Sequence, residues 1–222
     1  MVYQGPSLDP SLPPAVAGPA FLCDGTEVWV RPVQTSDGEL VRDFLDQESP
    51  ESLEMRAFLA SRPALAHEAI VRPSLPDDRL CLLVLGDRSD RVTVLGVGEY
   101  ARTGEGSTVA EVAFLVAGSF RGRGIATLLL ARLARAARAF GIVRFEARVR
   151  AENPELLEVF RGSGLPFSEE AAEGEIDVLI PLGPETGAKQ AGSATSTGGT
   201  AIGVDPGPAS GHARLSALRS RA

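Results

Sequence analysis

Residues 112–130 read VAFLVAGSFRGRGIATLLL, and this stretch decides the fold of the chain. Its first part is an apolar run of strand length, its middle is rich in glycine, and its last part has the apolar spacing of a helix. Glycine lets a turn approach a ligand closely, and a helix N-terminus directs backbone N–H groups and the positive end of its dipole toward an anion. Arg121 and Arg123 add positive charge at the turn. The stretch therefore predicts a strand, a turn and a helix that together bind phosphate.

The glycine spacing argues against two common phosphate-binding motifs. A nucleoside-triphosphate loop ends in Gly-Lys-Ser or Gly-Lys-Thr, and a dinucleotide fingerprint has three glycines at fixed spacing early in a βαβ unit. Neither fits here. The stretch instead contains Arg-x-x-Gly-x-Ala at Arg121, Gly124 and Ala126, which resembles the acyl-CoA diphosphate signature of the GNAT superfamily of N-acetyltransferases. The other interpretation is that Gly122 and Gly124 only connect strand and helix, with the arginines in solvent.

The resemblance covers about residues 26–182 and is carried further by residues 28–33, 140–142 and 151–165. It implies an α+β (α/β) fold of the GNAT type. Such a fold has a mixed, mainly antiparallel central sheet flanked by helices, and a splayed parallel strand pair that admits the pantetheine arm of the coenzyme.

Hydrophobic periodicity predicts the elements of this fold. Apolar runs predict strands at residues 27–33, 79–85, 92–100, 108–116 and 142–149. The second and third strands form a hairpin that the fourth extends, and the last must run parallel to the fourth because a helix connects them.

Three helices are predicted between and after these strands. The first follows a capping box at Ser36 and Glu39, the second runs from Ser49 to Leu59, and the third runs from Ile125 to Phe140. In the family, the first two helices border the acceptor site.

Composition divides the chain into three parts. Residues 1–25 are rich in proline and small residues, which predicts a flexible N-terminal arm. Residues 183–222 are rich in small residues and glycine, which predicts a low-complexity, disordered C-terminal tail. Residues 26–182 then form one domain. Three arginines lie off the apolar stripe of the third helix, and we expect them to face solvent: Arg132, Arg135 and Arg138.

Charge and rare residues argue against several classes of protein. A formal net charge of −7 argues against a nucleic-acid partner. The chain starts without the features of a secretory signal, and no apolar run is long enough to span a bilayer, so we expect a cytoplasmic protein with no membrane partner. The 2 cysteines and 2 histidines predict neither a disulfide framework nor a metal site.

The predicted chemistry needs a proton acceptor, because an amine is protonated near neutral pH and only its free form attacks a thioester. Glu111 opens its strand in an otherwise apolar setting, where burial would raise the pKa of its carboxyl group. Its position resembles that of the glutamate base in relatives that modify protein lysines. A strand-end glutamate facing water is the other interpretation. Glu99 is an alternative base, and so is Glu146, which alternation places beside Arg144 and Arg148 in an exposed ion pair.

The resemblance also implies the coenzyme contacts. Strand backbone at Leu115 and Val116 would supply donors to the oxyanion, and Asn153 matches the family asparagine that contacts the coenzyme, although it also fits a helix N-cap. Phe160 occupies the position where many relatives have a tyrosine that protonates the leaving thiolate; it would contact pantetheine or fill the core. The protein-lysine-acetylating relatives tend to have phenylalanine there. The predicted coenzyme-binding residues are Phe114, Leu115, Val116, Arg121, Gly122, Arg123, Gly124, Ile125, Ala126, Thr127, Asn153 and Phe160.

We therefore expect an N-acyltransferase that moves acetyl from acetyl-CoA to a primary amine by direct attack in a ternary complex. Residues 24–32, 49–52 and 110–113 resemble bacterial protein lysine acetyltransferases, which favours a protein lysine as the acceptor. Some of those relatives carry a fused acyl-CoA synthetase-like region, so a fusion partner or regulatory domain is also expected among relatives. The alternatives are acetylation of a small amine, a catalytically silent acyl-CoA-binding module, and a nucleoside-triphosphate binder.

Overall fold

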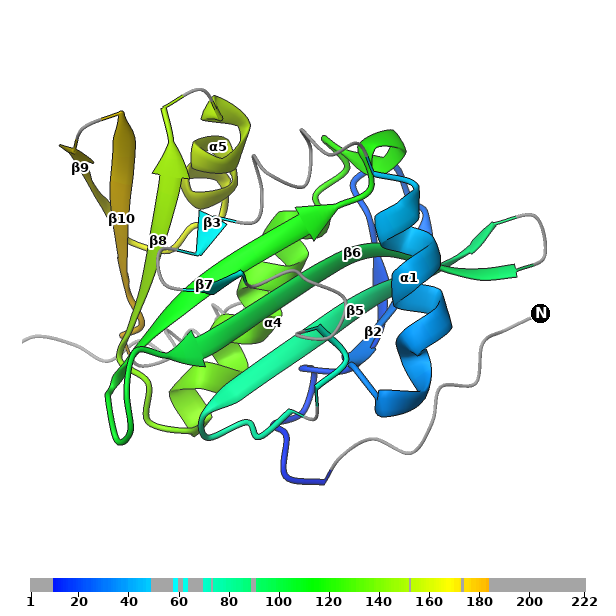
Figure 1. Cartoon of the computed structure of the whole chain (residues 1–222), viewed down its shortest axis with the longest axis horizontal. Coiled ribbons are helices and arrows are strands. Elements are labelled where there is room, and N and C mark those ends of the chain that lie inside the picture. Colours follow the sequence, from blue (N-terminus) through cyan, green and yellow to red (C-terminus); the bar gives the residue numbers. More distant parts are fainter. Residues whose placement is uncertain are drawn as a thin grey trace, which may run out of the picture. The chain divides into compact units, whose positions relative to one another are not determined.

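An eight-stranded sheet with the strand order β1-β2-β5-β6-β7-β8-β10-β9 lies at the centre of the computed structural model (Figure 1). All neighbouring strands are antiparallel except β7 and β8, which are parallel. The predicted α+β fold with a mainly antiparallel sheet is therefore confirmed. The structure describes residues 10–48, 58–59, 62–63, 70–72, 74–88, 91–151, 153–172 and 174–183. The strands of the sheet are β1 (Gly18–Phe21), β2 (Glu27–Pro32), β5 (Arg79–Arg88), β6 (Arg91–Arg102), β7 (Val109–Val116), β8 (Arg144–Arg150), β9 (Ser168–Ala172) and β10 (Glu175–Pro181).

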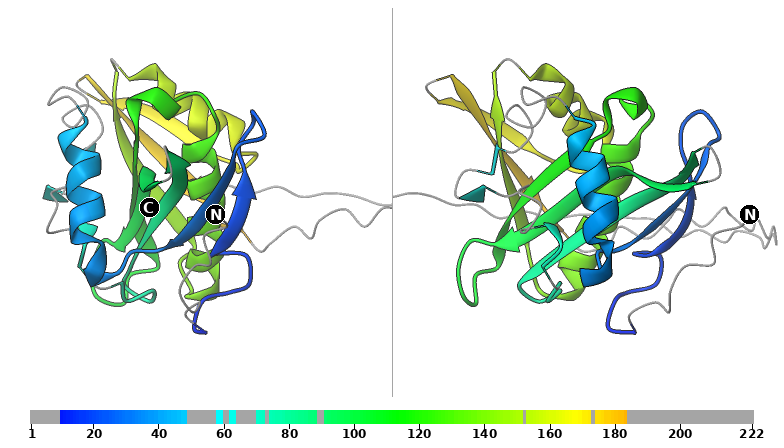
Figure 2. Two further views of the ribbon diagram at one scale, coloured as in Figure 1. Left: turned by 90° about the vertical axis from the view of Figure 1, so that its right-hand side faces the viewer. Right: turned by 45° about the vertical axis from the view of Figure 1, so that its right-hand side comes forward.

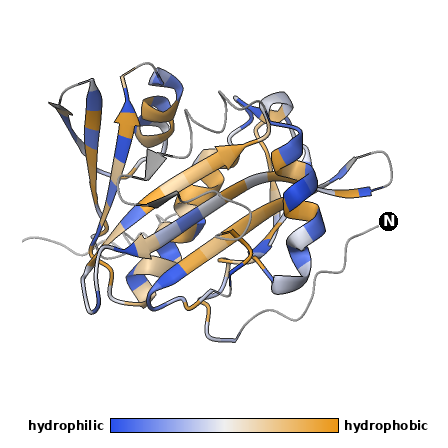
Figure 3. Cartoon of the chain, viewed as in Figure 1, coloured by the Kyte–Doolittle hydropathy of each residue, from blue (hydrophilic) through white to orange (hydrophobic). Residues whose placement is uncertain are grey.

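Helices cover both faces of this sheet (Figure 2). α1 (Gly38–Asp46) packs on one face, while α4 (Ile125–Ala139) and α5 (Pro154–Gly162) pack on the other. Alternation along β7 divides its side chains between the two layers: Phe114 lies in the core under α4, and Leu115 lies in the core under α1. Hydrophobic residues accordingly run along much of β5 and β7 (Figure 3), as expected for strands buried on both faces.

The parallel strands β7 and β8 separate after a short contact. They pair only from Val109 with Arg144 to Glu111 with Glu146, although both strands continue for several residues. Figure 1 shows them converging at one end and diverging toward α5. The main-chain groups of β7 beyond Glu111 therefore have no ladder partner on β8, and the splay implied by the family resemblance is present.

A buried ion pair fixes the start of α1. Arg31 on β2 donates two hydrogen bonds to the Asp37 carboxylate, at 2.6 and 2.7 Å. The same carboxylate accepts the N–H of Gln34 at 2.7 Å, so it closes the 3₁₀ turn (Thr35–Asp37) that leads into the helix. The sequence predicted a helix here, which is confirmed. The capping contact differs, because Asp37 rather than the Ser36–Glu39 pair reaches back to the preceding N–H.

The structure differs from the expected flexible arm from residue 10 onward. Residues 18–21 form β1 at the edge of the sheet, a position that tolerates Pro19 because an edge strand has one unpaired side. Arg132 and Arg135 of α4, which we expected to face solvent, bind main-chain carbonyl groups of this segment. They donate to Pro19 at 3.2 Å and to Pro14 at 3.1 Å, respectively.

Other predicted elements have mixed outcomes. The predicted second helix is wrong at Phe58–Leu59, which form the short strand β3 and pair with β4 (Arg62–Pro63); residues 49–57 lie outside the described part of the chain. β9 and β10 were not predicted. Arg138, which we also expected to face solvent, donates to Gly183 O at 2.8 Å. Residues 184–222 of the predicted tail lie outside the described residues. Within the described part, no helix is long and apolar enough to cross a membrane.

Candidate active site

A cavity of about 590 Å³ lies on the α4 face of the sheet, between the N-terminus of α4 and α5. It also reaches the part of β7 that no longer pairs with β8, because Phe114 and Val116 line it. Nine of the twelve predicted coenzyme-binding residues meet at this cavity: Phe114, Val116, Arg121, Gly122, Gly124, Ile125, Ala126, Thr127 and Asn153.

Positive backbone angles shape the glycine turn. Gly122 has a φ of 69° and Gly124 a φ of 87°, a region that side chains with a Cβ rarely adopt. Gly124 is the N-cap of α4 and has no side chain to accept from the first N–H groups of that helix. These groups and the helix dipole make the turn a site for an anion.

Arg121 and Arg123 have different surroundings. Arg121 lines the cavity, and its Nη2 lies 3.8 Å from the Glu48 carboxylate. Arg123 lies beside the cavity, where it pairs with Asp24 at 3.0 Å and stacks 4.7 Å from the centre of the Phe120 ring. Hydrogen bonds from Thr26 hold the pKa of the Asp24 carboxyl group below its usual value. A contact between Arg123 and the ligand remains a prediction.

The main chain of β7 offers groups to the open side of the splay. Ala117 N–H donates to Leu95 O on β6 at 2.9 Å, so odd-numbered residues of β7 direct their main-chain groups to β6. Phe114 and Val116 consequently direct theirs toward β8, where the ladder has ended. Leu115 directs its main chain to β6, and its side chain is fully buried on the α1 face, away from the cavity.

Asn153 and Phe160 hold opposite ends of α5. Asn153 is buried; its Oδ1 accepts the N–H of Leu156 at 3.4 Å, so it caps α5 while lining the cavity. The predicted roles of Asn153 as a helix N-cap and as a coenzyme contact are therefore compatible. Phe160 is only 1% exposed and belongs to the core under α4, and its ring does not line the cavity.

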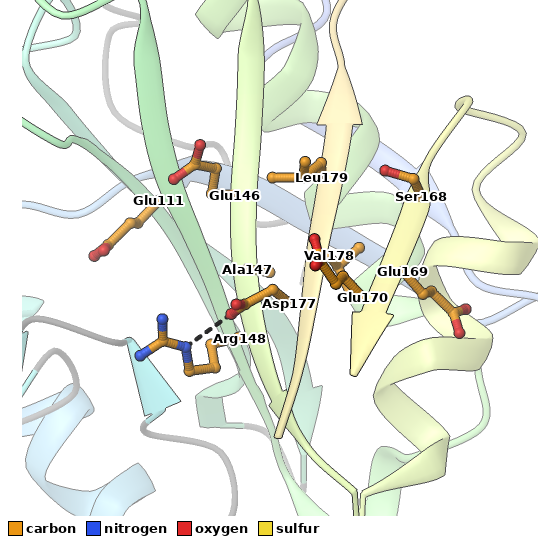
Figure 4. Close-up of a pocket in the computed structure, with 10 residues that line it drawn as sticks. All are labelled: Glu111, Glu146, Ala147, Arg148, Ser168, Glu169, Glu170, Asp177, Val178 and Leu179. Atoms are coloured by element: carbon orange, nitrogen blue, oxygen red, sulfur yellow. Dashed lines mark hydrogen bonds and ion pairs between the residues drawn. The ribbon is translucent and has the colours of Figure 1, made fainter. Parts of the chain in front are cut away.

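Glu111 lies in a second pocket, of about 430 Å³, on the face of the sheet opposite the first cavity. Its side chain is half-buried, and it projects on the same side as Glu146 and Arg148 of β8 (Figure 4). Arg148 donates to Asp177 at 2.8 Å, and this hydrogen bond is the largest cause that raises the pKa of Arg148; the negative charges of Asp177, Glu175 and Glu111 add to it. The setting of Glu111 is thus more charged than the apolar one that the sequence led us to expect.

The two alternative bases are engaged by arginines. Glu146 accepts a hydrogen bond from Arg144 at 2.8 Å on the same strand. Glu99 has a side chain that is only 4% exposed, and it pairs at 2.5 Å with Arg79, whose side chain is 8% exposed. The register of β6 and β7 places Glu99 opposite Ala113. Ala113 lies two residues after Glu111 on β7, so Glu99 and Glu111 project on the same face of the sheet.

Sequence reasoning missed several residues that line the first cavity. Cys23 is one of them: its N–H donates to Arg123 O at 3.2 Å, and its sulfur lies 2.8 Å from where a Cβ on Gly124 would stand. The chain separation of about a hundred residues left no local signal for this contact. The exposed side of α5 supplies four more lining residues: Glu155, Leu156, Glu158 and Val159.

Comparison with known proteins defines the class. Residues 43–165, more than half of the chain, match the acetyltransferase (GNAT) family, and the chain belongs to that family. The GNAT domain of S. lividans PAT is 30% identical, with a TM-score of 0.63, and the match covers 76% of this chain and 98% of that domain.

Two relatives of lower identity are longer than this chain. The acetyltransferase Pat of Mycolicibacterium smegmatis is 27% identical over 175 residues, which covers 75% of this chain and 52% of Pat. This chain thus spans about half the length of that curated relative. A cAMP-binding acyltransferase from Mycobacterium smegmatis, 23% identical over 76% of this chain and 48% of its own, has a TM-score of 0.53 and supports the fold alone.

Proposed function

We propose that this chain transfers the acetyl group of acetyl-CoA to a primary amine, with a protein lysine as the acceptor. The observation that carries the proposal is the position of the two pockets. The glycine-turn cavity lies on one face of the sheet and the Glu111 pocket on the other, beside the point where β7 and β8 separate. A thioester that enters through the splay would meet an amine arriving from the Glu111 side.

The first cavity suits the diphosphate and the pantetheine arm of the donor. The N–H groups at the start of α4 and the Arg121 guanidinium face it, and both favour an anion. Phe114 directs its amide and carbonyl groups to the side of β7 that faces β8 beyond the end of their ladder, where the amides of an extended arm can extend the sheet.

In the proposed mechanism, Glu111 takes a proton from the acceptor ammonium group, directly or through a water. The free amine attacks the thioester carbonyl carbon, so a C–N bond forms. Collapse of the tetrahedral intermediate breaks the C–S bond, and the second surplus proton of the nitrogen passes through water to the departing thiolate. The N–H of Val116, on the side of β7 that faces away from β6, is the candidate oxyanion donor. Phe160 has no phenol to serve as the acid, so solvent is assigned that role.

The preference for a protein lysine rests on the relatives and on charge. The similar structure is the GNAT domain of S. lividans PAT, and the similar protein Pat is an acetyltransferase. The sequence resemblance to bacterial protein lysine acetyltransferases includes residues 110–113, around Glu111. The pocket around Glu111 is also lined by more carboxylates than cations, which favours a cationic side chain. We assign the reaction to the cytoplasm, the reducing setting expected from the two free thiols.

The test combines binding and turnover. Calorimetry with CoA and acetyl-CoA should detect binding, and acetyl transfer should be seen by mass when lysine peptides are offered beside polyamines and free amino acids. Glu111→Gln should lower kcat about 100-fold or more with little change in coenzyme affinity, since it removes only the proton acceptor. Glu146→Gln is the matched control in the same pocket and should stay within about twofold.

The same experiment separates the rival functions. Coenzyme binding without transfer to any amine would indicate a silent binding module, and preferred transfer to a polyamine or an amino acid would indicate a small-molecule enzyme. Undiminished turnover in Glu111→Gln would remove the base assignment. No heat with either form of CoA at millimolar concentration would overturn the proposal altogether.

A further inference from the structure

Glu48 has a buried carboxylate that the proposed chemistry does not use. Its side chain is only 6% exposed. Oε1 accepts the N–H of Gly118 at 3.0 Å, and Oε2 lies 3.8 Å from Nη2 of Arg121. A buried carboxylate is unfavourable unless such partners compensate it, so both contacts contribute to holding this arrangement.

Glu48 follows the C-terminus of α1, and this helix is itself well fixed. Phe44, in the last turn of α1, is buried in the core on that face of the sheet, and the ion pair of Arg31 with Asp37 anchors the other end of the helix. The N–H of Glu48 donates to Leu45 O at 3.1 Å. The Glu48 carboxylate is thus held in a fixed position beside the turn between β7 and α4.

Arg121 stands between this carboxylate and the coenzyme cavity. It lines the cavity, and it also lines a separate groove of about 400 Å³ whose walls include Glu48 and Gly118. Gly118 begins the 3₁₀ turn Gly118–Phe120 that leads directly into Arg121. One carboxylate therefore contacts both the backbone that carries Arg121 and the guanidinium group itself.

We propose that Glu48 is a positioning residue that holds the turn and Arg121 in place for the diphosphate of the coenzyme. This inference rests on the proposed function. Two effects of Glu48 oppose each other. Its negative charge disfavours a nearby anion, whereas the geometry that it imposes places the Arg121 guanidinium and the turn where the anion binds. The placement by Glu48 exceeds its repulsion, because the Gly118 hydrogen bond fixes the start of the turn that leads into Arg121.

Two substitutions separate these effects. Glu48→Gln keeps an oxygen that can accept from Gly118 but removes the charge that faces Arg121. Glu48→Ala removes both contacts. We expect the KM for acetyl-CoA to rise about tenfold in Glu48→Ala and about threefold in Glu48→Gln, with kcat within about twofold of wild type in both. Glu39→Gln, at an exposed glutamate of helix α1, is the control and should leave both constants unchanged.

A truncated donor distinguishes positioning from general loss of structure. S-acetylpantetheine has the thioester and the arm but no diphosphate, so its kcat/KM should be the same in wild type and Glu48→Ala. In an Arg121→Ala background, Glu48→Ala should raise the KM for acetyl-CoA much less than it does alone, because the two residues act as one unit.

The outcomes are distinct. A wild-type KM in Glu48→Ala, or equal losses with both donors, overturns the inference while the proposed function stands. Additive effects of Glu48→Ala and Arg121→Ala also overturn it. If wild type binds no CoA and uses neither donor, the proposed function fails and this inference fails with it.

Discussion

At the scale of single residues, the 2 cysteines of the chain make a natural probe of whether the coenzyme occupies the glycine-turn cavity. Cys23 is exposed and lines the cavity. Cys81 is fully buried, and burial raises the pKa of its thiol well above the usual value, so little thiolate forms. We expect iodoacetamide to modify one cysteine in the native protein and both in denaturant, as counted by intact mass.

Saturating acetyl-CoA should slow this native labelling about tenfold or more, because the occupied cavity covers the Cys23 thiol. Cys23→Ser should abolish native labelling and thereby confirm which thiol reacts. A labelling rate that ignores acetyl-CoA would place the coenzyme elsewhere on the molecule.

Sequence reasoning can group residues whose partners are close in the chain. The residues from Arg121 to Thr127, except Arg123, line the glycine-turn cavity, and they form one turn and the first turn of one helix, so their grouping follows from local structure. Glu48 and Gly118 are 70 positions apart, and no local pattern indicates that they touch. The charged surroundings of Glu111 likewise come from β8 and β10, which the chain reaches only later.

At the scale of elements, the glycine turn can be tested by adding single methyl groups. Gly124→Ala should lower stability by about 1–2 kcal/mol, since its φ of 87° is strained for alanine. It should also raise the KM for acetyl-CoA about tenfold, because the new Cβ would stand 2.8 Å from the Cys23 sulfur at the anion site. Chemical denaturation and initial rates measure the two effects.

Two further glycines provide matched controls. Gly122→Ala has similar strain, with a φ of 69°, but its Cβ meets nothing within 4 Å. Its cost in the free energy of unfolding should therefore exceed the free energy that corresponds to its change in KM for acetyl-CoA. Gly162→Ala lies in α5 with open space around the new methyl group and should be neutral or stabilise by about 0.5–1 kcal/mol. Equal KM values in all three variants would contradict a tight anion site at Gly124.

The start of α1 depends on the buried pair of Arg31 and Asp37. Both side chains are 5% exposed, so Asp37→Asn leaves an arginine buried without its charge partner. We expect the free energy of unfolding in urea to fall by about 3–5 kcal/mol. Asp46→Asn, on an exposed position of the same helix, should change it by less than about 0.5 kcal/mol. A comparable loss in both variants would mean that net charge, and not this pair, stabilises the helix.

Most elements with clear periodicity were predictable, whereas the edge strands β1 and β9, and β10 beside β9, were not. The apolar alternation of β7 and the apolar stripe of α4 are visible within each segment alone, so the sequence of that segment indicates which of its residues are buried. β1 contains a proline and a glycine, and β9 reads SEEAA, so neither has the composition of a strand. Each pairs along one side only, with β2 and β10 respectively, so tertiary pairing overrides local preference.

At the scale of the whole domain, the two pockets on opposite faces of one sheet determine the order in which substrates can bind and the acetyl group can be transferred. A donor in the α4-face cavity and an acceptor beside Glu111 can be present together, because neither pocket overlaps the other. Nothing in this arrangement requires the acetyl group to pass through an enzyme side chain. Direct transfer in a ternary complex is the expected route.

Initial rates measured against both substrates should therefore give intersecting double-reciprocal lines, and CoA should inhibit competitively with acetyl-CoA. A search for an acetylated lysine intermediate needs one variant only, because Lys189 is the single lysine of the sequence. In Lys189→Arg, incubation with acetyl-CoA alone should leave the intact mass unchanged while transfer to a peptide continues. Parallel lines, together with an acetylated enzyme that passes its acetyl group to the peptide, would instead mean that the two faces work in succession through a side-chain carrier.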